Sequence, residues 1–325
     1  MAEARATCPR ARISESEIMK VVDLFAGCGG FTLGAELAGA NVVWAANHWP
    51  LAVRTHSTNH PDVVHECQDL MQKNWLELPE YDLLCASPAC QGHSLASQPR
   101  RSDKHEAMRT TAWAVVECIE QTRPKAFLVE NVEQFMAWQL LDIWIAALER
   151  LGYHVTAQVL NASRCGVPQR RKRLIVAGTL TKKVIIREPG TDELPFKDCL
   201  DDGLKYPSFI HSSWRPISEA GAGSRDRMRA ASLTHGRCLV QHVTGHRGIP
   251  LSEPIRTITT KAQWCLVDGN RYRWLTPREL ARGMSFPDSY WFPTDASIAD
   301  QKKLIGNAIP PLMAKIAVEQ ISEFA

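Results

Sequence analysis

Two residues that could act together in catalysis each follow an apolar run of this sequence. Cys90 stands in the stretch SPACQGHS (87–94), directly after the apolar run 81–86. A run of that length bounded by Pro and Gly predicts a buried strand, and a cysteine just past its end would lie at the carboxyl edge of a sheet. Cys90 is therefore a candidate nucleophile. The alternative is a small buried hydrophobic residue, and this stretch alone does not separate the two.

Glu130 follows a second apolar run, 125–129, which predicts another strand. If both strands are parallel members of one sheet, their carboxyl ends bring Glu130 beside Cys90. A nucleophile and an acid that converge through the topology of the fold are more informative than either residue alone.

A run of cations leads into a third apolar segment. The run QRRKR (169–173) precedes residues 174–178, and strand alternation directs Gln169, Arg171 and Arg173 to one side. Such a run is usually a solvated surface. Here the strand that follows would hold the arginines near the edge that carries Cys90 and Glu130.

The elements that must position these residues begin with a glycine turn. The apolar run 20–26 ends in GCGG (27–30), and residues 31–39 have helical spacing with a Gly stop. Strand, glycine turn and helix open a nucleotide-binding βαβ unit, because glycines let the backbone approach a ligand over the helix N-terminus. The spacing is not the dinucleotide fingerprint, so NAD is disfavoured, and a glycine turn alone is a weak signal.

Two further predicted strands suggest where an adenosine would lie. Residues 41–47 end at His48 and Trp49, and an exposed Trp49 there could stack on adenine or could instead pack in the core. The short strand 63–67 ends near Asp69. Its carboxylate could accept a hydrogen bond from an adenine amino group or could cap a helix.

The polar segment 92–105 lacks an apolar period and carries Arg100, Arg101 and Lys104 close to Cys90. A basic loop beside a reactive thiol predicts a lid that closes over a polyanion. An ordinary solvated loop is the alternative.

Composition bounds the remaining possibilities. A chain of 325 residues suggests two domains or one large domain with an insertion, and 45% hydrophobic residues exclude a disordered protein. Between residues 181 and 270 the βα alternation stops, and Gly, Pro and Ser become frequent among scattered Arg and His, which marks a second domain or insertion.

The histidines lack metal-ligand spacing, so no metal is expected. The net charge of +3 is too small to indicate nucleic acid by itself.

The ten cysteines include no C-x-x-C pair, and several lie in apolar runs, so we expect reduced thiols in a cytoplasmic protein. No segment approaches the roughly 20 apolar residues of a membrane span, and the N-terminus has no apolar signal region. Residues 1–18 are expected to form a mobile extension.

Taken together, these motifs resemble the cytosine-5 DNA methyltransferase family, and they occur in the family's order. The similarity extends from about Lys20 to the C-terminus and is carried by DLFAGCGGF at 23–31, P-x-C-Q at 88–91, ENV at 130–132, Q-x-R-x-R at 169–173, RWLTPRELAR-x-x-x-FPD from 273 and IGNAIPP at 305–311.

The resemblance implies an α/β fold with a Rossmann-like, S-adenosylmethionine-dependent methyltransferase sheet and a smaller target recognition domain. The implied division is a catalytic and cofactor-binding domain at 19–180, the target recognition domain at 181–295, and a C-terminal segment at 296–325 that returns to the catalytic domain. Double-stranded DNA is the implied partner of a monomeric, cytoplasmic enzyme of the kind that occurs in restriction-modification.

The resemblance also implies roles for individual residues. Cys90 would add to C6 of a flipped cytosine, Glu130 would bond N4 and N3, and Arg171 and Arg173 match arginines at the base and its neighbouring backbone. The implied cofactor-binding residues are Phe25, Gly27, Gly29, Gly30, His48, Trp49, Asp69, Pro88 and Asn307. The implied DNA-binding residues are Gln91, Ser94, Arg100, Arg101 and Gln169.

Two positions depart from the family pattern. Ala89 replaces the Pro that usually precedes the nucleophile, and His48 stands where the family places a ribose-binding Glu. A carboxylate accepts from both ribose hydroxyls, whereas a neutral imidazole offers one acceptor and one donor. Two alternatives remain open at this point, a tRNA cytosine-5 methyltransferase and a catalytically silent DNA-binding regulator of the same fold.

Overall fold

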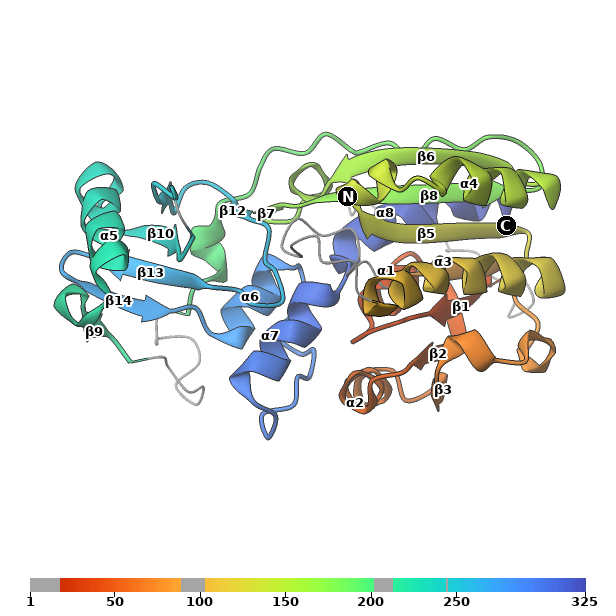
Figure 1. Cartoon of the computed structure of the whole chain (residues 1–325), viewed down its shortest axis with the longest axis horizontal. Helices are drawn as coiled ribbons and strands as arrows, with labels where there is room; N and C mark the ends of the chain where they lie inside the picture. The colour runs from red at the N-terminus through yellow and green to blue at the C-terminus, as the bar shows by residue number, and fades with distance from the viewer. Residues whose placement is uncertain (1–17, 89–102, 202–212, 244) are drawn as a thin grey trace, which may run out of the picture.

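A seven-stranded sheet organises the larger part of the chain (Figure 1). The computed structural model describes residues 18–88, 103–201, 213–243 and 245–325. The strand order is β3-β2-β1-β4-β5-β8-β6, with the first five parallel and β8 antiparallel to both of its neighbours. The strands are β1 Lys20–Leu24, β2 Asn41–Asn47, β3 Val64–Cys67, β4 Leu83–Ala86, β5 Ala126–Val132, β6 His154–Asn161 and β8 Lys172–Thr179.

Helices cover both faces of this sheet, which explains why its central strands are apolar at successive positions. Strand alternation sends Val21 and Leu128 into one apolar cluster and Val22 and Phe127 into another. The first cluster contains side chains of α1 (Gly30–Leu37) and α8 (Pro311–Ile321), and the second contains those of α3 (Asp103–Thr122) and α4 (Leu141–Arg150).

The strand order reverses between β1 and β4, and this reversal places the site. Open α/β sheets bind ligands at such a point, outside the carboxyl ends of the strands. The glycine turn follows β1 there, Ser87 and Pro88 follow β4, and helix α2 (Pro50–Asn59) begins just beyond β2.

A five-stranded sheet forms the smaller part of the molecule, on the left in Figure 1. Its order is β11-β10-β13-β14-β9, and neighbouring strands are antiparallel. The strands are β9 Arg215–Pro216, β10 Cys238–Gln241, β11 Ile249–Pro250, β13 Trp264–Asp268 and β14 Arg271–Trp274. Helix α5 (Ala222–His235) covers one face, where Met228 packs with Val240 and Cys265.

The opposite face of the small sheet joins the two parts of the molecule. Leu239 and Leu266 share a cluster with buried residues of α6 (Pro277–Gly283) and α7 (Ile298–Asn307), and with Cys28 of the glycine turn. A short parallel pair, β7 (Gln169–Arg170) with β12 (Ile255–Arg256), makes a second connection. The small sheet is therefore tied to the edge of the large sheet that carries the glycine turn.

The remaining elements are short 3-10 helices at Leu70–Gln72, Trp75–Glu77, Glu133–Ala137, Ala162–Cys165, Phe196–Cys199, Ile217–Glu219 and Ser322–Phe324. No helix in the described ranges is long and apolar enough to cross a membrane.

The predicted strands of the large sheet are present. Strand β5 runs on to Val132, so Glu130 lies within the strand and not after it.

Candidate active site

The turn between β1 and α1 is shaped by glycine and faces open space. Gly27 and Gly29 have positive φ values of 57° and 94°, which glycine adopts at little cost. A Cβ atom added to Gly27 would meet no atom of the described residues within 4 Å, whereas one added to Gly30 would lie 2.3 Å from the carbonyl oxygen of Ile309. Phe25 also has a positive φ, 57°, which is uncommon for a residue with a side chain. The turn thus leaves room on one side while the IGNAIPP segment packs against it.

Cys28, in the middle of this turn, is held from two directions. Its carbonyl oxygen accepts a hydrogen bond from Tyr290 Oη at 2.5 Å, and its Sγ donates to the carbonyl oxygen of Leu304 at 3.4 Å. Burial raises the pKa of the Cys28 thiol to about 12, so it stays protonated at neutral pH. Cys28 therefore supports the turn and does not compete as a nucleophile.

The predicted adenosine-binding residues lie at the ends of the next two strands. Trp49 is the N-cap residue of α2, is half-buried, and has Lys303 Nζ 4.5 Å from its ring centroid. His48 is exposed beside it. Asp69 is exposed and accepts a hydrogen bond from Met71 N at 3.0 Å, which is the helix-capping role that the sequence left open. Asn307, the last residue of α7, is exposed.

A buried ion pair marks the other half of the edge. Glu130 Oε1 lies 2.8 Å from Arg173 Nε, and both side chains are at most 10% exposed. The antiparallel register of β5 and β8 brings these residues together, since Val132 faces Arg173. Asn131 Nδ2 donates to the carbonyl oxygen of Pro88 at 3.2 Å. The strand that carries Glu130 thus also holds the chain two residues before Cys90.

Five predicted site residues fall outside the described part of the chain. They are the candidate nucleophile Cys90 and the predicted DNA-binding residues Gln91, Ser94, Arg100 and Arg101.

Two predicted roles need correction. Arg171 is 1% exposed, and its guanidinium donates to the carbonyl oxygens of Ile258 (2.7 Å), Gly306 and Ala308 (both 2.9 Å). Gln169 is fully buried and bonds the backbone of Gly283 and Ile258. Strand alternation correctly predicted that both side chains point to the same side of the strand. That side faces the interior, where the two parts of the molecule meet. In this structure neither residue is available to a base or to DNA.

The sequence did not reveal a buried polar chain under the glycine turn. Thr32 Oγ1 donates to Asp23 Oδ2 at 2.8 Å and lies 2.9 Å from His56 Nε2. The other ring nitrogen of His56, Nδ1, lies 2.7 Å from His65 Nε2. Burial raises the pKa of Asp23 to about 7 and lowers that of His56 well below its usual value. The one sign of this buried polar group in the sequence was Asp23, an acidic residue inside the apolar run 20–26.

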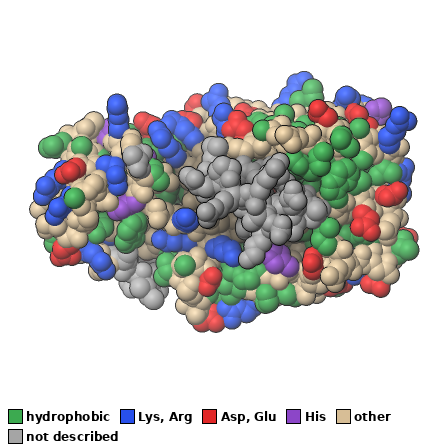
Figure 2. Space-filling model, in the orientation of Figure 1, with side chains coloured by type: hydrophobic (Ala, Val, Ile, Leu, Met, Phe, Trp, Pro, Cys, Tyr) green, Lys and Arg blue, Asp and Glu red, His purple; other side chains and the backbone are tan. Residues whose placement is uncertain are grey.

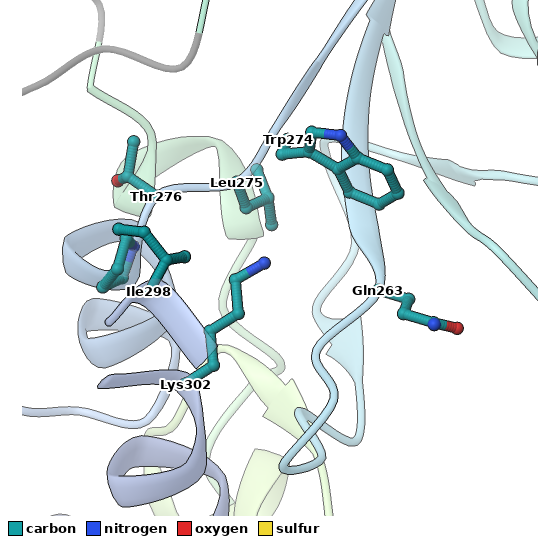
Figure 3. A pocket seen from close by; sticks show the side chains of 7 residues that line it. Gln263, Trp274, Leu275, Thr276, Ile298 and Lys302 are labelled. Atoms are coloured by element: carbon teal, nitrogen blue, oxygen red, sulfur yellow. The ribbon is translucent and has the colours of Figure 1, made fainter. Parts of the chain in front are cut away.

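A hollow of about 370 Å³ lies between the small sheet and α7 (Figure 3). Lys302 extends from α7 toward Trp274 of β14, with Nζ 5.7 Å from the ring centroid. Burial lowers the pKa of Lys302. The hollow is lined mainly by apolar groups and includes none of the predicted site residues.

Arginines are frequent on the surface of the small sheet and its helix. Figure 2 shows Lys and Arg side chains over this part of the visible face. The exposed arginines there are Arg215, Arg229, Arg237, Arg247, Arg256 and Arg271. Three or more His, Cys, Asp or Glu side chains arranged to hold a metal ion are not found among the described residues.

The fold and the site define an α/β protein whose glycine turn and buried carboxylate–guanidinium pair lie at the same edge of one sheet. A model of the C-5 cytosine-specific DNA methylase family matches residues 19–202 and 202–323. The chain belongs to this family, so the resemblance inferred from its motifs is confirmed. It is a DNA cytosine-5 methyltransferase, and the methyl donor of this family is S-adenosylmethionine.

Individual relatives agree with the family match. The Type II methyltransferase M.HindV of Haemophilus influenzae is 30% identical, over 94% of this chain and 97% of its own. A solved structure titled as a DNA modification methyltransferase encoded within an E. coli prophage has a TM-score of 0.71 at 22% identity, covering 94% and 99% of the two chains. A Spodoptera frugiperda DNMT2 mutant has a TM-score of 0.70 at 16% identity, covering 93% and 99%. At these identities, the two structures support the fold alone.

Proposed function

We propose that this enzyme methylates a flipped cytosine in duplex DNA, with Cys90 as the nucleophile and the Glu130–Arg173 pair at the base edge. The observation that carries the proposal is the buried 2.8 Å contact between Glu130 and Arg173, on the strand that also bonds Pro88. Cys90 follows Pro88 by two residues in the sequence, and this bond holds Pro88 beside the strand that carries Glu130. The nucleophile and the acid are thus supported as neighbours.

The proposed chemistry follows from the low nucleophilicity of cytosine C5. C5 is a weak nucleophile until C6 carries an adduct, and a thiolate suits this addition because it is intrinsically nucleophilic. As Cys90 sulfur bonds C6, electron density moves to N3, where Glu130 would share a proton and also accept from the N4 amino group. Arg173 holds that carboxylate in place in a water-poor setting, where such interactions are strongest. Loss of the C5 proton and of Cys90 after methylation restores the ring.

The glycine turn fits the cofactor that the family uses. Gly27 faces open space at positive φ, and the helix that follows presents its N-terminus, so backbone groups can approach a nucleoside there. S-adenosylmethionine bound here would supply an electrophilic methyl group. Phe25, Gly27, Gly29 and Gly30 would line its amino acid end, and Trp49, His48 and Asp69 its adenosine. Pro88 and Asn307 would complete the set.

We assign DNA binding to the small-sheet part, which lies within the proposed target recognition domain at 181–295. Exposed arginines around the small sheet suit phosphate contacts, which position a protein on the duplex without reading sequence. The proposed catalytic domain spans 19–180, and residues 296–325 return to it, in keeping with the packing of α8 against α1. We propose that the enzyme acts as a monomer in the cytoplasm and serves a modification system.

The decisive experiment traps the covalent adduct. Duplex DNA that contains 5-fluorocytosine should form a stable complex with the wild type and none with Cys90→Ser, because fluorine at C5 blocks the elimination that releases the enzyme. Labelled methyl transfer to duplex DNA, with tRNA as the competing substrate, tests the substrate class. Absence of an adduct with every DNA tested, or equal adduct formation by Cys90→Ser, would refute the proposed nucleophile. Bisulfite sequencing of DNA from expressing cells would identify the target sequence.

A further inference from the structure

Tyr290 makes a contact with the cofactor turn that none of the predicted site residues makes. It lies on the segment between α6 and α7 and is 4% exposed. Its Oη donates to the carbonyl oxygen of Cys28 at 2.5 Å, across 262 residues of sequence. Cys28 is the residue between the two positive-φ glycines, Gly27 and Gly29. A side chain from a remote segment therefore bonds the main chain at the centre of the turn.

Tyr290 is in turn held by a chain of polar groups. His60 Nε2 lies 3.0 Å from Tyr290 Oη, and His60 Nδ1 lies 2.8 Å from Glu36 Oε1. A phenol has one proton, and Tyr290 gives it to Cys28, so Oη must accept from a protonated His60 Nε2. On the other side of the ring, His60 Nδ1 faces the Glu36 carboxylate, which accepts hydrogen bonds. The order Glu36, His60, Tyr290, Cys28 carbonyl satisfies each group in the chain.

The shape of the turn is matched to this phenol. A Cβ atom added to Gly29 would lie 2.4 Å from Tyr290 Oη and 3.0 Å from His60 Nε2. The absence of a side chain at position 29 is therefore required by the clamp, as well as by the φ of 94°. At Gly27, by contrast, such an added atom would have no neighbour within 4 Å in the part of the chain that the structure describes. One glycine makes room for the support and the other for a ligand.

We propose that Tyr290, held by His60 and Glu36, is a positioning residue that keeps the cofactor turn in its binding-competent conformation. This inference rests on the proposed placement of S-adenosylmethionine over residues 27–30. The turn has positive φ at Phe25, Gly27 and Gly29, and glycine-rich backbone has several accessible conformations. A clamp on the Cys28 carbonyl selects one of them. When the binding-competent fraction falls, the apparent Kd rises by the same factor.

The consequence is specific to cofactor affinity. Tyr290→Phe keeps the ring and removes the hydroxyl, which leaves the Cys28 carbonyl and the His60 donor without this partner. Leaving buried groups unsatisfied costs enough to shift an equilibrium by about tenfold. We expect the Kd and KM for S-adenosylmethionine to rise about tenfold, because the loosened turn must be ordered when the cofactor binds. At saturating cofactor the turn is ordered again, so kcat should stay within about twofold.

The chain offers a matched control in Tyr153. Its Oη donates to the carbonyl oxygen of Pro124 at 2.5 Å, and the residue is 3% exposed. Tyr153→Phe therefore removes the same kind of buried bond from a position that does not contact the turn. Both variants should unfold at a lower urea concentration than the wild type. Only Tyr290→Phe should raise the Kd for S-adenosylmethionine, measured by calorimetry on the full chain without DNA.

Glu36→Gln tests the same series of polar groups from its exposed end, since the Glu36 side chain is 39% exposed. It replaces the charged acceptor beside His60 Nδ1 with a neutral amide, so a smaller rise in Kd, about threefold, is expected. This variant also tests the inference if Tyr290→Phe does not fold. Wild-type affinity in a folded Tyr290→Phe, or a fall in kcat with unchanged KM, would overturn the inference. If the wild type itself binds no S-adenosylmethionine, the cofactor placement fails instead, and the two failures are thereby distinguished.

Discussion

The edge of the large sheet and the surface of the small sheet use charge in opposite ways. At the large-sheet edge, Glu130 and Arg173 are buried and paired at 2.8 Å, and Asp23 bonds Thr32 in the interior. On the small sheet and its helix, arginines such as Arg229 of α5 and Arg271 of β14 are exposed. Buried groups with fixed partners define one geometry, whereas exposed cations on flexible side chains can adapt to a partner. This difference is what the proposed function requires, because chemistry needs fixed distances and binding to a polyanion does not.

The largest expected effect comes from breaking the buried pair. Arg173→Met should lower the free energy of unfolding by about 3–5 kcal/mol, because it leaves Glu130 buried without its counter-charge. Methyl transfer should fall with it, since the carboxylate loses its support at the base edge. Urea unfolding and single-turnover kinetics measure the two effects. Lys172→Met, which removes an exposed cation one position away, is the control and should change neither.

Asp23→Asn should reveal a cost that depends on pH. Burial raises the pKa of Asp23 to about 7 from an unfolded value near 3.8, so the folded state keeps the proton longer than the unfolded chain. The free energy of unfolding therefore declines by about 4 kcal/mol as the pH rises from about 4 to about 7, because the unfolded chain ionises Asp23 first. Above about pH 7 this contribution no longer changes. Asparagine cannot ionise, and its amide oxygen can still accept the hydrogen bond from Thr32 Oγ1. Its urea midpoint relative to the wild type should be higher at pH 8 than at pH 5, and an equal difference at both would contradict the assignment.

His48→Glu tests the departure at the cofactor rim. A carboxylate there could accept from both ribose hydroxyls, so the Kd for S-adenosylmethionine should fall about tenfold. Calorimetry measures the change, and the exposed His154→Glu on β6 controls for the added negative charge. Unchanged or weaker binding by His48→Glu would show that the ribose does not lie against this residue.

The smallest effect is expected at an exposed arginine beside the small sheet, on β12. Arg256→Gln should weaken DNA binding a few-fold and lower the salt dependence of binding by about one unit of slope, as removal of a phosphate contact does. Its urea midpoint should not change, because exposed substitutions usually stay within about 0.5 kcal/mol. Arg187→Gln, an exposed change beside the large sheet, is the matched control. A stability loss at Arg256 without a change in DNA affinity would break the comparison drawn above.

Local signals predicted the frame of the site well. Glycines and apolar runs located the turn at 27–30 and the strands on either side of it, and topology then placed Glu130 at the edge that follows Pro88. The sequence also indicated that Arg173 lies near this edge, but its pairing with Glu130 was not predicted, because it depends on β8 running antiparallel to β5. These results depend on residues close in sequence or on rules of sheet topology.

Contacts between remote segments were beyond such reasoning. Strand alternation predicted that the side chains of Arg171 and Gln169 point to the same side. Their hydrogen-bond partners on that side, however, are backbone groups of the remote residues 258, 283, 306 and 308. Tyr290 reaches Cys28 over 262 residues for the same reason. Periodicity states which way a side chain points, and only the packed fold states what it meets.

The burial of thiols has a practical consequence for chemical labelling. Burial raises the pKa of Cys28, Cys118, Cys165, Cys199 and Cys265 to about 12 and that of Cys238 to about 11, and it raises that of Cys85 well above its usual value. Alkylating reagents attack thiolates, so these seven should remain unmodified in native protein at pH 7.5 while exposed Cys67 serves as an internal standard. Peptide mapping after brief alkylation can then follow Cys90 directly, and its protection by bound DNA can be measured without replacing any other cysteine.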